Sequence, residues 1–144
     1  MASMLDELQG RNGPAFSPDG RTIYVIGSRT RPHRLICAWD HDAGKLSNKR
    51  LTTRAGGPGA LDGMAVDPLG NLRRGLRARG ELGAQADVLD RARVFARGGR
   101  PLALSYLSER RAKVCFSGAK NNRLFMASTH WHFALYVNVR GAVA

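Results

Sequence analysis

The sequence predicts an all-β chain built from the blades of a β-propeller, with about three blades present. One observation is an internal repeat, because residues 13–20 align with residues 63–70 and a further step of 50 reaches residues 114–118. The other is the turn chemistry that divides each copy into short strands, with four strands in each complete copy. A period of about 50 residues with four strands per copy is typical of propeller blades.

Each copy is expected to open with a hairpin, because Pro, Asp and Gly follow a short apolar strand and supply the conformations that a tight turn requires. The second strands are predicted over residues 22–26, 71–76 and 123–127. Third strands are expected over 35–40 and 93–96, and outer strands over 46–52 and 101–107. The third copy supplies only 115–116, 124–127 and 134–139.

One predicted strand conflicts with its place inside a blade. Arg73 and Arg74 are adjacent in the segment 71–76, and neighbouring strand residues point to opposite faces. At least one guanidinium therefore has to enter a packed layer, where an unpaired charge costs several kcal/mol.

The whole chain, 1–144, is expected to form a single partial propeller domain with repeat units of about 12–61, 62–111 and 112–144. Closed propellers use four to eight blades, so this chain is part of a propeller or completes its ring with another copy. Unpaired strand edges and open blade faces predict self-association or a complementing half-propeller.

Composition limits the classes of partner. The net charge is +12, and 19 of the 23 basic residues are Arg, but they are scattered and no aromatic platform accompanies them. No nucleic-acid partner is therefore expected; the alternative is binding through Arg73 to Arg100, which would weaken steeply with salt. The chain has no apolar run of about 18 residues and no secretory signal at residues 1–10, so we expect a cytoplasmic protein without a membrane partner. Cys37 and Cys115 are expected to be reduced core residues.

Four segments together resemble the C-terminal half of the gluconolactonase family, which includes regucalcin, the senescence marker protein. They are NGPAFSPDGRTIYV (12–25), DGMAVD (62–67), NNRLFMA (121–127) and LYVNVRG (135–141). The resemblance implies a six-bladed propeller that holds one divalent cation in its channel and hydrolyses sugar lactones there. Calcium is the implied cation, with zinc or magnesium as alternatives.

The resemblance also implies two site residues. Asn12 and Asp62 match the family's metal ligands, and Asp62 also matches its catalytic general base. Because the two residues are one repeat period apart, they are expected at equivalent places on adjacent blades, facing the axis. A hard cation prefers such oxygen ligands and polarises a carbonyl as a Lewis acid. The alternative hypothesis is that Asn12 and Asp62 are ordinary turn residues before Gly13 and Gly63.

Activity is left open by what the sequence lacks. The family's remaining ligand, a Glu near the start of its full-length chain, has no counterpart here, and two oxygen ligands fall short of the six to eight that calcium takes. The alternatives are a non-catalytic half-propeller that serves as an interaction module, or the product of a decayed gene.

Overall fold

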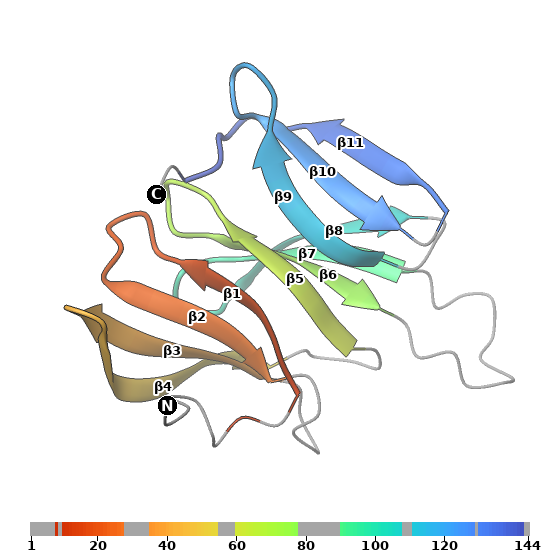
Figure 1. Ribbon diagram of the computed structural model, residues 1–144. Helices are drawn as coiled ribbons and strands as arrows, with labels where there is room; N and C mark the ends of the chain where they lie inside the picture. Colours follow the sequence, from red (N-terminus) through yellow and green to blue (C-terminus); the bar gives the residue numbers. More distant parts are fainter. Residues whose placement is uncertain are drawn as a thin grey trace, which may run out of the picture.

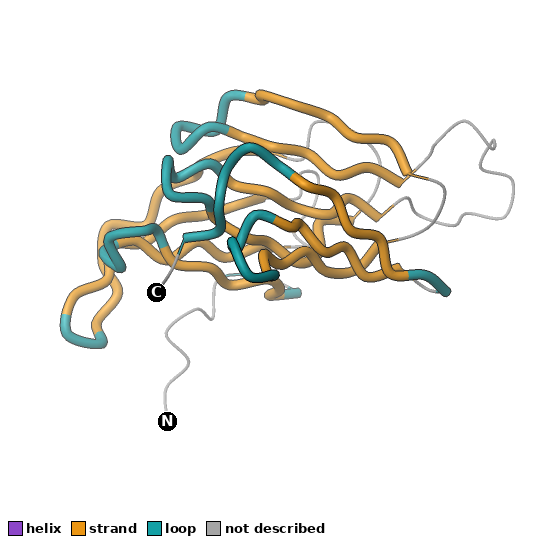
Figure 2. The backbone as a smooth tube through the Cα atoms, turned by 90° about the horizontal axis from the view of Figure 1, so that it is seen from above, coloured by secondary structure: helices purple, strands orange, loops and turns teal. Residues whose placement is uncertain are grey.

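The computed structural model describes residues 8, 10–27, 35–54, 60–77, 90–107, 111–128 and 130–142. Every regular element in this part of the chain is a β-strand, as Figure 2 shows, so the all-β prediction is confirmed. The strands are β1 (Arg11–Phe16), β2 (Thr22–Gly27), β3 (Leu35–Asp42), β4 (Lys45–Arg54), β5 (Ala60–Val66), β6 (Leu72–Arg77), β7 (Asp90–Phe95), β8 (Pro101–Leu107), β9 (Arg111–Ser117), β10 (Arg123–Ser128) and β11 (His132–Tyr136). Among the described residues there is also no helix long and apolar enough to cross a membrane.

The strands form three antiparallel sheets in which neighbours along the chain are neighbours in space. The first sheet has the order β1-β2-β3-β4, the second β5-β6-β7-β8 and the third β9-β10-β11. The first strand of each sheet lies toward the centre, with β1 against β5 and β5 against β9 (Figure 1). This is the arrangement of successive propeller blades around their inner strands.

Tight turns fix the hairpins between first and second strands. The fully buried carboxylate of Asp67 accepts hydrogen bonds from the backbone N–H groups of Leu69 and Asn71, at 3.1 and 3.0 Å. Ser17 holds the equivalent place in the first sheet, where its hydroxyl accepts from the Thr22 N–H at 2.9 Å. Short polar side chains that satisfy turn N–H groups in this way set the register of the strands that follow.

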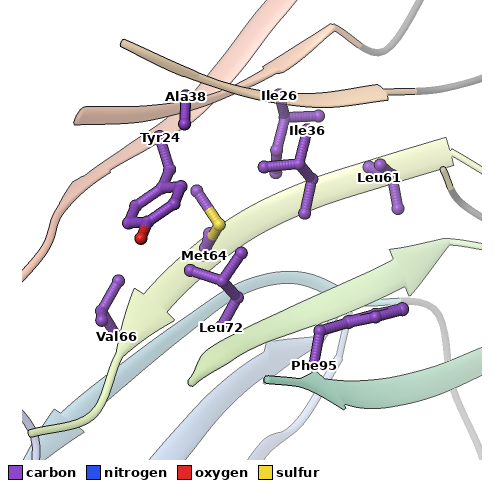
Figure 3. Packing of buried hydrophobic residues seen from close by; sticks show 9 residues of the cluster. All are labelled: Tyr24, Ile26, Ile36, Ala38, Leu61, Met64, Val66, Leu72 and Phe95. Atoms are coloured by element: carbon purple, nitrogen blue, oxygen red, sulfur yellow. The ribbon is translucent and has the colours of Figure 1, made fainter. Parts of the chain in front are cut away.

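The first and second sheets pack through an apolar layer. Alternate residues of β2 and β3 face the second sheet, and Tyr24, Ile26, Ile36 and Ala38 are all buried there. The second sheet contributes Leu61, Met64, Val66, Leu72 and Phe95 to the same layer (Figure 3). Complete burial of a side chain such as Ile26 or Leu72 stabilises the fold by roughly 1.5–3 kcal/mol.

A second apolar layer joins the second and third sheets, through Ala65, Ala92, Val114, Phe116, Leu124, Met126, Phe133 and Val137. The outward face of the first sheet carries a third cluster, in which Leu8 packs with Val25, Cys37 and Trp39. The expectation for the cysteines is half right: Cys37 is buried, but Cys115 is exposed because it lies on the opposite face of β9 from the apolar layer.

Arg73 and Arg74, adjacent in β6, both lie in packed layers. Arg73 points toward the third sheet, where its guanidinium lies 5.6 Å from the Phe116 ring centroid and its Nη2 is 3.3 Å from Asp67 Oδ2. Arg74 points toward the first sheet, is completely buried and lies 4.4 Å from the Phe95 ring centroid. Burial, together with the charge of Arg93 on the next strand, lowers the pKa of Arg74 to about 9. The predicted conflict is real: Arg73 has the Asp67 carboxylate beside it, whereas burial disfavours the charged form of Arg74.

Candidate site at the β1 and β5 bulges

The site is built on a backbone irregularity that the inner strands share. Between Asn12 and Ala15 the pairing of β1 with β2 shifts by one residue, and the pairing of β5 with β6 shifts between Leu61 and Met64. A bulge inserts one extra residue into a strand and redirects the side chains beside it. Asn12 and Asp62 lie at these two bulges, one repeat period apart.

The structure brings the two predicted residues into contact. Asn12 Nδ2 donates a hydrogen bond of 2.7 Å to Asp62 Oδ1 across the boundary between the first and second sheets. Each side-chain oxygen also accepts from the glycine that follows it: Gly13 N lies 2.8 Å from Asn12 Oδ1, and Gly63 N lies 3.0 Å from Asp62 Oδ1. The alternative hypothesis was that Asn12 and Asp62 are ordinary turn residues. The bonds from the two glycine N–H groups are of that kind, and they occur together with the contact between the blades.

Gly13 permits this close approach. Its φ of +50° is left-handed, and an added Cβ would lie 3.2 Å from both Asp62 O and Met64 N and 3.0 Å from Ile26 Cδ1. A side chain here would push β1 away from β5 and separate the two polar residues. Sequence reasoning did not assign this role to Gly13, although the Asn-Gly and Asp-Gly pairs at matching positions were a visible signal.

The donor set can be compared with what a cation requires. Asp62 Oδ2 receives no hydrogen bond from the described residues, so one carboxylate oxygen is available as a ligand. The carbonyl oxygen of Asn12 is a second oxygen of the kind that hard cations bind. Within the described part of the chain, no group of three or more His, Cys, Asp or Glu side chains is placed to hold a metal ion. The pair fits calcium in chemical kind and supplies too few ligands on its own.

The third copy differs from the other two at this position. β9 also shifts its register, between the residues that pair with Ala127 and Ser128. The sequence position one further period along from Asp62 is Ala112, an amino acid with no side-chain oxygen. The repeated bulge therefore carries a polar residue in two of its three copies.

A cavity of about 450 Å³ lies at the other ends of the inner strands. Its lining is mostly apolar, and three of its residues, Phe16, Val66 and Phe116, are related by the repeat period. Asn12 and Asp62 are at the opposite ends of β1 and β5 and do not line this cavity.

Comparisons with solved structures identify the architecture. A gluconolactonase from Xanthomonas campestris is 27% identical, with a TM-score of 0.69, and is matched over 90% of this chain and 38% of its own. A luciferin-regenerating enzyme is 21% identical, with a TM-score of 0.72, over 91% of this chain and 46% of its own. Regucalcin from Agrobacterium tumefaciens, a calcium-binding protein, is 18% identical, with a TM-score of 0.74, over 91% and 47%. The chain thus spans less than half the length of these proteins, and its fold is a partial propeller of the gluconolactonase type, as predicted.

No curated protein matches the sequence. The family model for the SMP-30/gluconolactonase/LRE-like region, in contrast, matches residues 1–130. The match covers both candidate site residues and all of the first two sheets. This chain therefore belongs to the SMP-30/gluconolactonase/LRE-like family.

Proposed function

We propose that this protein takes part in metal-assisted hydrolysis of a sugar lactone, in the cytoplasm, with Asn12 and Asp62 at the reacting centre. The observation that carries the proposal is the 2.7 Å contact between Asn12 Nδ2 and Asp62 Oδ1, which joins equivalent bulges of two adjacent blades. The family resemblance implies that both residues face the channel. The solved structures similar to this chain include a gluconolactonase and a calcium-binding regucalcin, which supports the proposal.

Each residue has a defined part in this chemistry. Asn12 and Asp62 would hold the divalent cation, calcium in the first instance, and the bound cation would polarise the lactone carbonyl. The carboxylate of Asp62 accepts the proton of the attacking water as the water oxygen bonds to the carbonyl carbon. The ring C–O bond then breaks, and the released alcohol oxygen takes up a proton to give the open hydroxy acid. The Gly63 N–H, bonded to Asp62 Oδ1 at 3.0 Å, holds the carboxylate in place.

The test is hydrolysis of glucono-δ-lactone by the purified chain with and without calcium, after subtraction of the spontaneous reaction. We expect a calcium-dependent rate that falls at least about 100-fold in Asp62→Asn, because general-base catalysis typically contributes 10²–10⁴-fold. Asp19→Asn is the matched control, since Asp19 lies in an exposed turn away from the pair. A folded protein with no rate above background, or one in which both variants behave alike, would contradict the proposal.

A second candidate is a non-catalytic half-propeller that acts as an interaction module, or a decayed gene product. Two observations favour it: Ala112 at the third bulge and Arg74 inside an apolar layer. This candidate predicts assembly without turnover. Neither proposal requires a nucleic acid or a membrane as a partner.

A further inference from the structure

The first two sheets each present one face to the sheet that follows, and the third sheet has a face at the same register positions. In each, one residue from each of the first three strands forms a row across the sheet, set by the strand register. The rows are Ala15, Tyr24 and Ala38; Ala65, Arg73 and Val94; and Cys115, Phe125 and Ala134. The first and third rows share a pattern of two small residues flanking an aromatic ring.

The first two rows are covered and the third is open. Tyr24 and Ala38 are each 2% exposed beneath the second sheet, and Ala65 and Arg73 pack against the third. In the third sheet Cys115 and Ala134 are exposed and Phe125 is partly exposed, and no described residue forms a further sheet on them. The third sheet thus leaves open the register positions that another sheet covers at both of the internal boundaries.

The outward face of the first sheet is the counterpart. Val25 and Cys37 occupy the register positions that Met126 and Phe133 occupy in the third sheet, where those two residues pack against the second sheet. The face is apolar, with Ile23, Val25, Cys37 and Trp39, and Leu8 packs on it. If the open row of a third sheet packed on this face, it would contact residues at particular register positions. These are the same register positions that the row of the second sheet contacts on the third sheet.

We propose that the open face of the third sheet docks on the outward face of the first sheet in a second copy, and that the reciprocal contact closes a ring of six sheets. The contact continues a packing mode that the chain already uses twice. Each copy spans 38–47% of the length of the solved relatives, so two copies together approach one relative's length. Leu8 covers part of the receiving face and has to be displaced when the partner sheet arrives.

Ring closure would also complete the candidate site. If the proposed function holds, two copies place two Asn12 and two Asp62 side chains around one channel, so the number of protein ligands doubles. Each copy carries a net charge of +12, which opposes association at low ionic strength. Dimerisation should therefore strengthen as salt is added, the reverse of what nucleic-acid binding would show.

The experiment is sedimentation velocity and native mass spectrometry over a range of concentration and salt. We expect a species of twice the 15.7 kDa chain mass, favoured at higher salt. Ala134→Arg should weaken the dimer at least about tenfold, since it places a desolvated charge within a packed face. Cys115→Arg, on β9 at the other side of β10, should do the same. Ala119→Arg is the control, because Ala119 is exposed in the turn between β9 and β10 and lies off the face. Far-UV circular dichroism and thermal melts establish that each variant is folded.

A chain that stays monomeric at all salt concentrations would overturn the inference, as would a dimer that tolerates both face variants. Leu8→Ala should tighten the dimer, and a folded variant with looser association would argue against displacement at this face. The readout is independent of turnover. A dimer without lactone hydrolysis supports the inference and contradicts the proposed function, whereas hydrolysis by a monomer does the opposite.

Discussion

Arg73 and Arg74 of β6 lie on opposite faces of the second sheet, in different surroundings. Toward the third sheet, Arg73 meets the buried Asp67 carboxylate at 3.3 Å, and Asn71 Nδ2 donates to the same carboxylate at 3.0 Å. Toward the first sheet, Arg74 lies on Phe95 with a second arginine, Arg93, paired opposite it on β7. The difference teaches that a turn carboxylate at the start of a strand can lie beside a charge in one packed layer, while burial disfavours the charged form of the next residue in the other layer.

Loss of the Asp67 charge should have the largest effect. Asp67→Asn leaves Arg73 partly buried without its counter-ion and weakens the turn that Asp67 holds, so we expect a loss of about 3 kcal/mol in the free energy of unfolding. Urea denaturation measures this loss. Asp19→Asn, in the exposed turn of the first sheet, should cost much less, because solvent screens the charge of this carboxylate. Equal losses in the two variants would show that the buried pair adds nothing.

Replacement of Arg74 should have the opposite sign. Arg74 takes the register position that Met126 takes in the third sheet and Val25 in the first, so Arg74→Met restores the apolar pattern of the repeat. We expect a gain of about 1–3 kcal/mol, because burial of a charge costs more than burial of a side chain of similar volume without one. The matched variant Arg73→Met should destabilise the protein by depriving Asp67 of its partner. A loss on Arg74→Met would mean that Arg74 contributes net stability.

The smallest effect is a pH dependence that belongs to Arg74. Its pKa in the folded protein, about 9, lies below that of the unfolded chain, so between these values the unfolded state binds more protons. Stability should therefore rise with pH from about 9 upward, by about 1 kcal/mol between pH 9 and 10 for a single proton. Arg74→Met should lack this increment. Subtraction of the variant's curve from the wild-type curve isolates it, and parallel curves would contradict the assignment.

The sequence predicted the strands well where turn residues border them, as at β8, whose bounds match residues 101–107, and at the turn through Gly44 between β3 and β4. It was less accurate at β11, expected over 134–139 and observed at His132–Tyr136. There the apolar residues Val137 and Val139 suggested a longer strand, but the chain turns back so that Gly141 N bonds to Asn121 O and Ala142 N to Val66 O. Such contacts join residues distant in sequence, and no local pattern reveals them.

For the candidate site, periodicity predicted equivalent places for Asn12 and Asp62 on adjacent blades, and the structure places them one period apart at the bulges of β1 and β5. Periodicity did not reveal that they bond to each other, because that contact depends on the bulge geometry and on the small size of Gly13. The environment of Arg73 and Arg74 was predicted only in part. Strand alternation showed that a charge must enter a packed layer, but not that Asp67, which resembled an ordinary turn residue, would lie beside one guanidinium.

The inner strands share a backbone bulge, whereas the residue at the bulge differs from strand to strand. Because a bulge recurs at the same place in β1, β5 and β9, each inner strand offers an equivalent position for a side chain. The sequence has Asn12, Asp62 and Ala112 at these positions. A protein built in this way can change the chemistry of such a position by one substitution while its backbone stays the same, so the side chains and the architecture are free to evolve at different rates.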